Sequence, residues 1–316
     1  MSECHEINDV RPTSIRHLTG QTHIIMQVGV ALDAAFADGR KFDSALLVGG
    51  AGLGKSALAA VIAAEMATTF HEVLGQSIKT PADLNALLLA AKHKDVLHID
   101  ECHLLKKEFQ TSLYLAMDQR KFIVQPGCGQ APYSIPIEDF TLLLSTTDEY
   151  SLLQPLRDRM KLTLRFDFYS VEELAVVAAQ RAKGLHWDVE EQVFPQVAQR
   201  ARGTPRLALR LLQAAHRVCR SQGEQTITRD HLQLACDLEQ IDGLGLGPTE
   251  RKYLQIVAQG PTRLNVIASL LGLPPRTVSQ VTEQFLVRAT FIVKDDQGRR
   301  QLTAQGRDHV YIASNS

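Results

Sequence analysis

The chain has 316 residues, 45% of them hydrophobic, and a formal net charge of −1. This length and apolar content suffice for two or three domains with sizeable cores. No apolar run approaches the ~20 residues of a membrane span, the polar N-terminus is unlike a signal peptide, and the five scattered cysteines include no C-x-x-C pair typical of zinc sites or disulfide frameworks. We therefore expect a cytoplasmic protein with no membrane partner.

Residues 1–167 are predicted to form an α/β domain with a parallel sheet, because short apolar runs alternate with helical patterns. The predicted strands are 44–48, 71–74, 96–100 and 140–145, and the predicted helices are 56–68, 83–91 and 108–117. Two further apolar segments, 122–124 and 133–137, flank a Gly/Pro stretch and predict a β-hairpin.

Residues 168–241 are predicted to be all-helical. Ser170 suits a helix N-cap, with Glu172 and Glu173 in the first turn. Further helices are expected after Thr204-Pro205 and from Thr228.

Residues 242–316 begin with a glycine-rich break at 243–248 and show a winged-helix pattern of three helices and a terminal hairpin. The predicted helices are 249–258, 263–270 and 275–288, and the hairpin strands are 291–293 and 300–302. This region carries nine Lys and Arg against six Asp and Glu, and it is the only basic region of the chain. DNA contact is expected there.

The most informative motif is G-x-x-x-x-G-K-S, the phosphate-binding P-loop, at residues 49–56. Its glycines let successive backbone N–H groups curl around a phosphate, which a Cβ would obstruct. Lys55 would bind the β- and γ-phosphates, and the Ser56 hydroxyl would hold Mg²⁺. The alternative is a chance glycine-rich turn, but an apolar strand precedes the motif and an Ala-rich helix follows it.

Two later strands end in polar groups that suit ATP hydrolysis. Asp100 would hold the Mg²⁺ shell, and Glu101 would orient and polarise the attacking water. The alternative is that both acids cap the next helix. Thr146 could hydrogen-bond the attacking water or the γ-phosphate, although hydroxyls end many strands.

Two arginines complete the candidate set. Arg159, in the loop entered through Pro155, could neutralise charge on the phosphoryl group of a neighbouring subunit. The alternative is a surface salt-bridge cluster. Arg206 opens a helix and could reach a nucleotide between domains, or it could simply be solvated.

In combination, these motifs resemble the RuvB family of AAA+ ATPases, the bacterial motors of Holliday-junction branch migration. The resemblance rests on Arg11-Pro12, the segments 18–21 and 52–55, and the segments 98–103, 155–159 and 201–206. It implies a large AAA+ ATPase domain, a helical lid and a winged helix that assemble as a hexameric ring on duplex DNA. It further implies sensor 1 at Thr146, a trans-acting arginine finger at Arg159 and sensor 2 at Arg206.

The resemblance also places Arg11, Pro12 and the 18–21 turn at the adenine pocket, and it makes hairpin 122–137 the docking site of a RuvA-like partner. The expected nucleotide-binding residues are Arg11, Pro12, Gly49, Gly52, Leu53, Gly54, Lys55, Ser56, Ala57 and Arg206. The expected catalytic residues are Lys55, Asp100, Glu101, Thr146, Arg159 and Arg206, with Ser56 and Asp100 as Mg²⁺ ligands and Lys294, Arg299 and Arg300 as DNA contacts. His98 and His103 are expected to be packing or capping groups.

The leading hypothesis is an ATP-driven ring motor on four-way-junction or duplex DNA. Two alternatives remain open: a nucleotide-switched DNA-binding or scaffold protein that moves no strand, and a protein-remodelling ATPase. The chain departs from the family pattern at Gly50-Ala51, at Asp148 and in the Pro-containing hairpin, and its wing tip carries Asp295-Asp296. These departures are typical of a divergent paralogue.

Overall fold

The structure is a computed structural model that describes residues 12–124 and 133–314, and it divides into two compact units. The first unit comprises the chain up to Val177 together with Thr204–Arg206. The second comprises Ala178–Gly203 and the chain from Leu207 onward. Arg11 and the hairpin tip at 125–132, for which expectations were stated above, lie outside the described residues.

The first unit is built on a five-stranded sheet in the order β2-β3-β6-β1-β7, with every pair parallel. Its strands are β1 (Ala45–Val48), β2 (Phe70–Leu74), β3 (Val96–Asp100), β6 (Thr141–Thr146) and β7 (Leu162–Arg165). The four predicted strands are confirmed. The edge strand β7 was not predicted, because it alternates apolar and polar residues and lacks the continuous apolar run of a central parallel strand.

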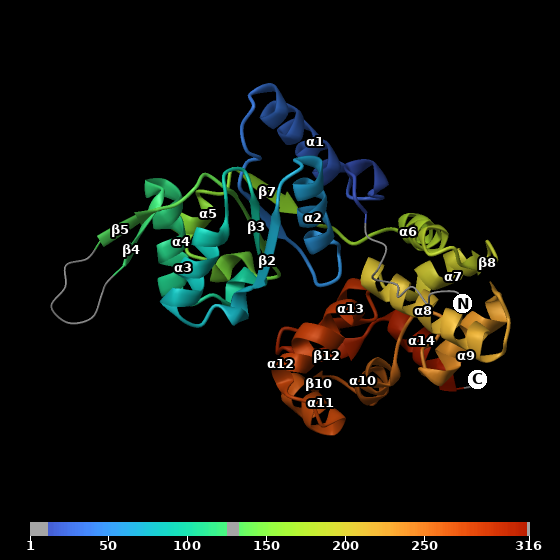
Figure 1. Cartoon of the computed structure of the whole chain (residues 1–316). Coiled ribbons are helices and arrows are strands. Elements are labelled where there is room, and N and C mark those ends of the chain that lie inside the picture. Colours follow the sequence, from blue (N-terminus) through green and yellow to red (C-terminus); the bar gives the residue numbers. More distant parts are fainter. Residues whose placement is uncertain (1–11, 125–132, 315–316) are drawn as a thin grey trace. The chain divides into compact units, whose positions relative to one another are not determined.

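Helices cover both faces of this sheet (Figure 1). On one face lie α1 (Thr22–Ala37) and α2 (Lys55–Glu65), and on the other α3 (Pro81–Ala90) and α4 (Lys107–Gln119). Successive strand residues point to opposite faces. Leu46 and Leu144 accordingly pack in the core under α3 and α4, whereas Leu47 and Leu143 pack in the core under α1 and α2.

A two-stranded antiparallel ribbon projects from the first unit (Figure 1). Its strands are β4 (Lys121–Val124) and β5 (Tyr133–Pro136), so the predicted hairpin is confirmed in its described strands. At its base the N–H of Ile137 donates to the carbonyl of Arg120 at 2.9 Å. Phe122 and Ile135 are its apolar contacts with the core.

The lid helices follow the sheet. They are α6 (Val171–Gly184), α7 (Val193–Arg200), α8 (Pro205–Ser221) and α9 (Arg229–Leu238), with a short parallel pair of β8 (Asp188–Val189) and β9 (Thr226–Ile227). The predicted cap of α6 is confirmed: Ser170 Oγ accepts from the N–H of Glu173 at 3.1 Å, and Glu173 Oε2 accepts from the N–H of Ser170 at 2.9 Å. Thr228 caps α9 as predicted.

The C-terminal part of the second unit has the winged-helix pattern. It contains α10 (Pro248–Ala258), α11 (Leu264–Leu271), α12 (Pro275–Thr277), a π-helical turn (Val278–Thr282), α13 (Glu283–Arg288) and α14 (Ala304–Ser314). Its sheet contains β10 (Thr262–Arg263), β11 (Ile292–Lys294) and β12 (Arg299–Leu302). Tyr253, Ile267, Leu286 and Ile292 form much of its core. None of the helices described in either unit is long and apolar enough to cross a membrane.

Candidate active site

The candidate site lies where the carboxyl ends of three parallel strands meet. The P-loop leaves β1, the acidic pair ends β3, and Thr146 ends β6. The N–H of Gly49 donates to the carbonyl of Thr146 at 3.1 Å, and Ser56 Oγ donates to Asp100 Oδ2 at 3.1 Å. Groups from three distant stretches of sequence therefore share one edge of the sheet.

The P-loop needs its glycines for two separate reasons. Gly52 and Gly54 adopt left-handed backbone conformations with φ of 80° and 99°, which L side chains rarely adopt. A Cβ at Gly49 would lie 2.7 Å from Phe166 Cβ and 3.0 Å from the Phe166 carbonyl oxygen. Ala57, by contrast, lies in the first turn of α2 and is only partly buried.

Lys55 is folded back onto its own loop. Its ammonium donates to the carbonyls of Gly49 at 2.9 Å and Gly50 at 2.8 Å. Burial lowers the pKa of Lys55 below its usual value, while Glu101 and Asp100 oppose that shift. The Lys55 ammonium thus hydrogen-bonds two neutral carbonyl groups and lies near two acids. A bound phosphate would offer it charged oxygen acceptors, which form stronger hydrogen bonds than carbonyls.

His103 joins the acidic pair to Thr146, a contact that the sequence did not indicate. Glu101 has a left-handed backbone (φ 49°), and its N–H donates to Asp100 Oδ1 at 2.9 Å. His103 Nδ1 lies 3.3 Å from Glu101 Oε2 and 3.2 Å from Thr146 Oγ1. The only available signal was its position two residues after Glu101, and the expectation of a packing or capping group was incomplete.

His98 is a packing group, as expected. It is fully buried in β3, with Nε2 2.7 Å from Ser145 Oγ and Nδ1 3.2 Å from Glu72 Oε1. Burial lowers the pKa of this imidazole. Cys102, beside the acidic pair, is also buried, which raises the pKa of its thiol and disfavours the reactive thiolate.

The turn at 18–21 packs against the segment that follows β7, and that segment in turn contacts the P-loop. Gln21 Nε2 donates to the carbonyl of Asp167 at 2.6 Å, and the N–H of Asp167 donates to Gln21 Oε1 at 3.1 Å. The Tyr169 hydroxyl donates to the carbonyl of Leu53 at 3.2 Å, and burial raises its pKa to about 12. Pro12 precedes this turn and is partly exposed.

The two predicted arginines have different surroundings. Arg206 belongs to the first unit, where its N–H donates to the carbonyl of Gly52 at 3.4 Å. A Cβ on Gly52 would lie 2.8 Å from Arg206 Cβ, so the two backbones are in close contact. Arg159 instead has its contacts with α4 and Pro155. The structure thus brings Arg206 to the P-loop and holds Arg159 elsewhere in the same unit.

Three family models together match nearly the whole chain. Those described as the Holliday junction DNA helicase RuvB P-loop domain, the RuvB AAA lid domain and the RuvB C-terminal winged helix domain match residues 10–166, 169–242 and 243–311. The "Holliday junction branch migration complex subunit RuvB 2" of Synechococcus sp. (strain JA-3-3Ab) is 35% identical over 304 residues, which are 94% of this chain and 82% of that protein. The chain belongs to the RuvB family.

Other RuvB proteins are similar to this chain over most of its length. RuvB of Ehrlichia ruminantium (strain Gardel) is 34% identical over 94% of this chain and 92% of its own length. The solved structure of Thermotoga maritima RuvB described as a Holliday junction branch migration motor has a TM-score of 0.82 at 32% identity, over 95% of this chain and 98% of that one. The AAA+, lid and winged-helix fold of the RuvB family is therefore confirmed, and the chain is a P-loop ATPase of this class.

The wing of this RuvB-family chain presents two of its three predicted cations. The side chains of Lys294 and Arg299 are 49% and 40% exposed, whereas Arg300 is only 10% exposed. Arg300 points inward and binds Glu283 through Nε at 2.8 Å and Nη2 at 3.2 Å. The strand alternation that buries Leu302 also buries Arg300, so the expectation that Arg300 contacts DNA needs correction.

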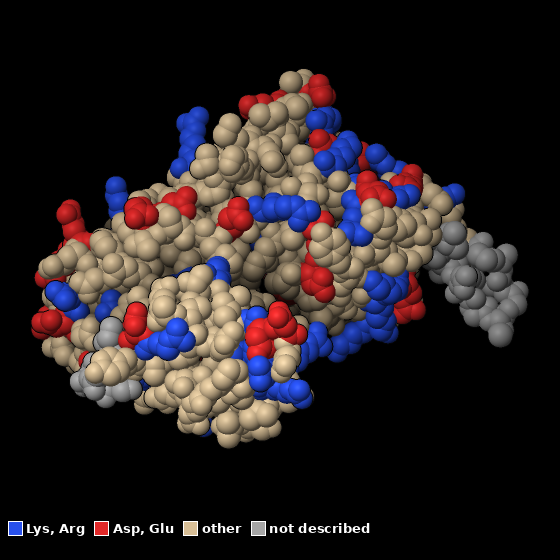
Figure 2. Space-filling model, turned by 180° about the vertical axis from the view of Figure 1, so that it is seen from behind, with Lys and Arg blue, Asp and Glu red and all other residues tan. Residues whose placement is uncertain are grey.

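Charge is finely mixed on the face of the molecule drawn in Figure 2, where Lys and Arg alternate with Asp and Glu. The wing itself shows this mixing, because Arg299 Nε donates to Asp295 Oδ2 at 2.8 Å. Such pairing weakens the cation excess on which sequence-independent DNA binding depends.

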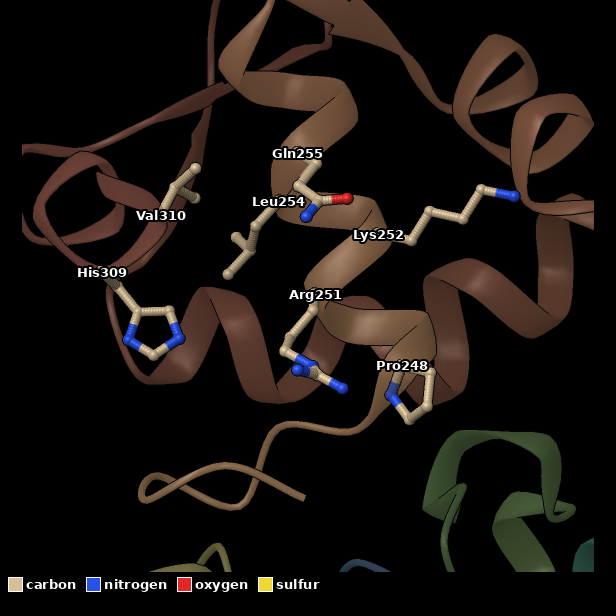
Figure 3. Close-up of a pocket in the computed structure, with 7 residues that line it drawn as sticks. All are labelled: Pro248, Arg251, Lys252, Leu254, Gln255, His309 and Val310. Atoms are coloured by element: carbon tan, nitrogen blue, oxygen red, sulfur yellow. The ribbon is translucent and has the colours of Figure 1, made fainter. Parts of the chain in front are cut away.

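A cavity of about 330 Å³ lies outside the P-loop region, between α10 and α14 (Figure 3). Arg251 and His309 line it from the two helices, while Lys252 points away from His309. Arg251 donates to the carbonyl of Gln240 at 3.0 Å, and His309 Nε2 lies 3.0 Å from Asp242 Oδ2. These two side chains therefore tie the winged helix to the segment before it, and we assign the cavity no ligand.

Proposed function

We propose that this chain is an ATP-driven ring motor that moves DNA strands at Holliday junctions. The observation that carries the proposal is the grouping of P-loop, acidic pair, Thr146 and Arg206 in one unit of a chain that also has a winged helix. The RuvB relatives are named for branch migration, and their matches extend over most of this chain.

Nucleotide binding falls to the P-loop and its neighbours. The N–H groups of the loop and Lys55 would bind the phosphates, and Tyr169 with the 18–21 turn would border the base together with Arg11 and Pro12. Ser56 and Asp100 offer a hydroxyl and a carboxylate oxygen 3.1 Å apart, a donor set that suits Mg²⁺. No group of three or more ionisable metal ligands gathers among the described residues, so phosphate and water oxygens would supply the other positions.

Hydrolysis falls to the acidic pair and Thr146. The Glu101 carboxylate would accept the proton of the attacking water, and the Thr146 hydroxyl would orient that water or the γ-phosphate. Arg206 would report the state of the nucleotide from the start of α8. Mg²⁺ bound at Ser56 and Asp100 would neutralise charge on the phosphates.

Assembly into a ring would add one more catalytic group to each site, an arginine from the neighbouring subunit. Arg159 would act on the nucleotide of the neighbouring subunit in a hexamer. Lys294 and Arg299 would contact the DNA backbone, and the β4–β5 ribbon would dock a RuvA-like partner. Family membership and the exposure of the two wing cations support these proposed roles.

The decisive measurement compares the wild type with Glu101→Gln in ATPase assays with and without four-way-junction DNA. The junction should stimulate wild-type turnover, and Glu101→Gln should still bind ATP while turnover falls by roughly 10²- to 10⁴-fold. No stimulation by DNA would favour a protein-remodelling ATPase instead.

A second assay follows the strands of a synthetic four-way junction. ATP-dependent separation of the junction by the wild type would support the motor. DNA binding that responds to ATP without strand movement would overturn it in favour of the nucleotide-switched binding protein.

A further inference from the structure

Arg159 is held in a cradle of three groups. Its Nε lies 2.8 Å from both carboxylate oxygens of Asp118, and its Nη2 donates to Asp118 Oδ2 at 2.5 Å. Its Nη1 donates to the carbonyl of Pro155 at 2.6 Å. The guanidinium carbon lies 4.8 Å from the centre of the Tyr114 ring. Both α4 and the first turn of α5 (Gln154–Arg157) thus fix the orientation of the guanidinium plane.

Asp118 occupies an electrostatically unfavourable position unless a cation accompanies it. It lies in the last turn of α4, where the partial negative charge of the helix C-terminus disfavours a carboxylate. That turn holds no Lys or Arg, and the C-cap residue Arg120 is paired with Asp139 at 2.7 Å. Arg159 supplies the compensating charge, and its hydrogen bond lowers the pKa of the Asp118 carboxyl. The helix alone therefore gives no reason for an acid at this position, whereas the contact with Arg159 does.

The cradle leaves part of the guanidinium available. Arginine has five N–H donors, and the hydrogen bonds to Asp118 and Pro155 engage one on each of its three nitrogens. Within the described chain, one N–H on each terminal nitrogen then remains for an incoming anion. The Arg159 and Asp118 side chains are 31% and 42% exposed, so a second copy of the chain can reach them.

We propose that Asp118 is a positioning residue that presents Arg159 to the nucleotide of the neighbouring subunit. The proposal rests on the trans-acting role of Arg159 given above. A free arginine side chain loses much rotamer entropy when it is immobilised at a transition state. A cradle that fixes the side chain beforehand removes that cost and sets the angle at which its free N–H groups meet the phosphate.

The first test measures the ATPase of Asp118→Ala and Asp118→Asn. We expect kcat to fall about 10- to 100-fold in Asp118→Ala with the KM for ATP little changed, because a misplaced catalytic group loses rate and not substrate affinity. Asp118→Asn keeps one hydrogen-bond acceptor and should fall less. Unchanged or increased turnover in Asp118→Ala would overturn the proposal, and an increase would show that Asp118 sequesters Arg159.

The matched control is Asp38→Ala, which removes the carboxylate of another exposed Asp–Arg pair, with Arg40, at 3.1 Å. It should leave kcat unchanged. Thermal unfolding of all three variants keeps the result interpretable: if only Asp118→Ala is unfolded, Asp118→Asn carries the test.

Subunit mixing separates this proposal from the trans assignment itself. Lys55→Ala subunits lack a working site but keep Arg159 and Asp118 intact. Mixing them with Arg159→Ala subunits should restore ATPase activity, and no restoration would refute the trans-acting finger. If that control mixture recovers, Asp118→Ala mixed with Lys55→Ala should recover as well. No recovery there would show that Asp118 acts within its own subunit and would overturn the positioning role alone.

Discussion

His103 is the residue that links the two catalytic strands. Its Nδ1 lies within 3.3 Å of Glu101 Oε2 and 3.2 Å of Thr146 Oγ1, so one imidazole restrains both proposed water-orienting groups. A residue in this position can influence turnover without contacting substrate.

We predict that His103→Ala lowers kcat about tenfold or more while the KM for ATP changes little. The variant loses the hydrogen bond to Thr146 and the contact with Glu101. A lost hydrogen bond costs roughly 0.5–1.5 kcal/mol, and about 1.4 kcal/mol corresponds to a factor of ten in rate. Steady-state ATPase kinetics measure both parameters. The exposed His93 provides the control: His93→Ala should behave as wild type, and equal losses in the two variants would contradict the assignment.

The sequence could single out Lys55, Ser56, Asp100 and Thr146 as candidates because each belongs to a motif or ends an apolar strand. It could not identify the contacts of His103, Asp118 or Tyr169, because these depend on how far-apart segments pack. Arg300 shows the opposite error. Its inward direction follows from its alternation with Leu302, but the buried Glu283 that makes this tolerable comes from another element.

At the scale of the element, the two adjacent glycines of the P-loop, Gly49 and Gly50, differ in how closely the rest of the strand–loop–helix unit packs against them. A Cβ on Gly49 would meet Phe166 at 2.7 Å, whereas a Cβ on Gly50 would lie 3.5 Å from Leu53 and 3.7 Å from Phe168, which are ordinary van der Waals distances. Both positions have backbone conformations open to alanine.

We predict that Gly49→Ala lowers the free energy of unfolding by about 1–3 kcal/mol, as expected when a methyl group is forced into a packed region. Gly50→Ala should change it by no more than about 0.5 kcal/mol. Urea unfolding of the nucleotide-free protein measures both. Equal stabilities of the two variants would show that Phe166 can move away from the loop at little cost.

The wing also gives two adjacent residues different surroundings, because Arg299 is exposed and Arg300 is buried. We predict that Arg300→Ala destabilises the winged helix by about 1–3 kcal/mol, because the buried Glu283 carboxylate loses its bidentate partner and keeps only Lys294, whose Nζ lies 3.5 Å from Oε1. Arg299→Ala should leave the free energy of unfolding nearly unchanged. It should reduce by about one the slope of log K for DNA binding against log salt concentration. Thermal unfolding and DNA titrations over a range of salt check the two effects. A reversed pattern would contradict the inward orientation of Arg300.

At the scale of the whole molecule, one pentapeptide belongs to both units. Arg206 contacts Gly52 in the first unit, while Arg202, four residues earlier, bonds within the second. Arg202 donates through Nε to the carbonyl of Gly245 at 2.6 Å and through Nη1 to Glu250 at 2.8 Å, and its guanidinium lies 5.0 Å from the centre of the Phe285 ring. Four peptide bonds thus separate a residue that hydrogen-bonds the P-loop from one anchored in the winged helix.

We predict that Arg202→Ala destabilises the second unit by about 2–4 kcal/mol at pH 7. Burial alone would raise the pKa of Glu250, but Arg202 and the backbone N–H groups of Gly247 and Glu250 together offset burial, and the pKa is lowered. The charge contribution is therefore complete above the ordinary glutamate pKa of about 4.3 and is lost as the pH falls through the lower folded value.

Urea unfolding at pH 7 and at pH 3 checks this prediction, since the difference between wild type and variant should shrink at pH 3. An equal difference at both values would mean that packing, not charge, dominates. Arg217→Ala is the control, because the pair of Arg217 with Glu239 is long and exposed and should contribute at most about 0.5 kcal/mol.

The β4–β5 ribbon is closed at its base by the hydrogen bond between Ile137 and Arg120. Residues inserted or deleted beyond that closure leave the ends of α4 and β6 where they are, so they alter neither the strand register nor the position of Thr146. Selection can therefore remodel the ribbon while the hydrolytic groups stay under separate constraint. We therefore expect that a chain with a lengthened or shortened ribbon keeps its ATPase activity.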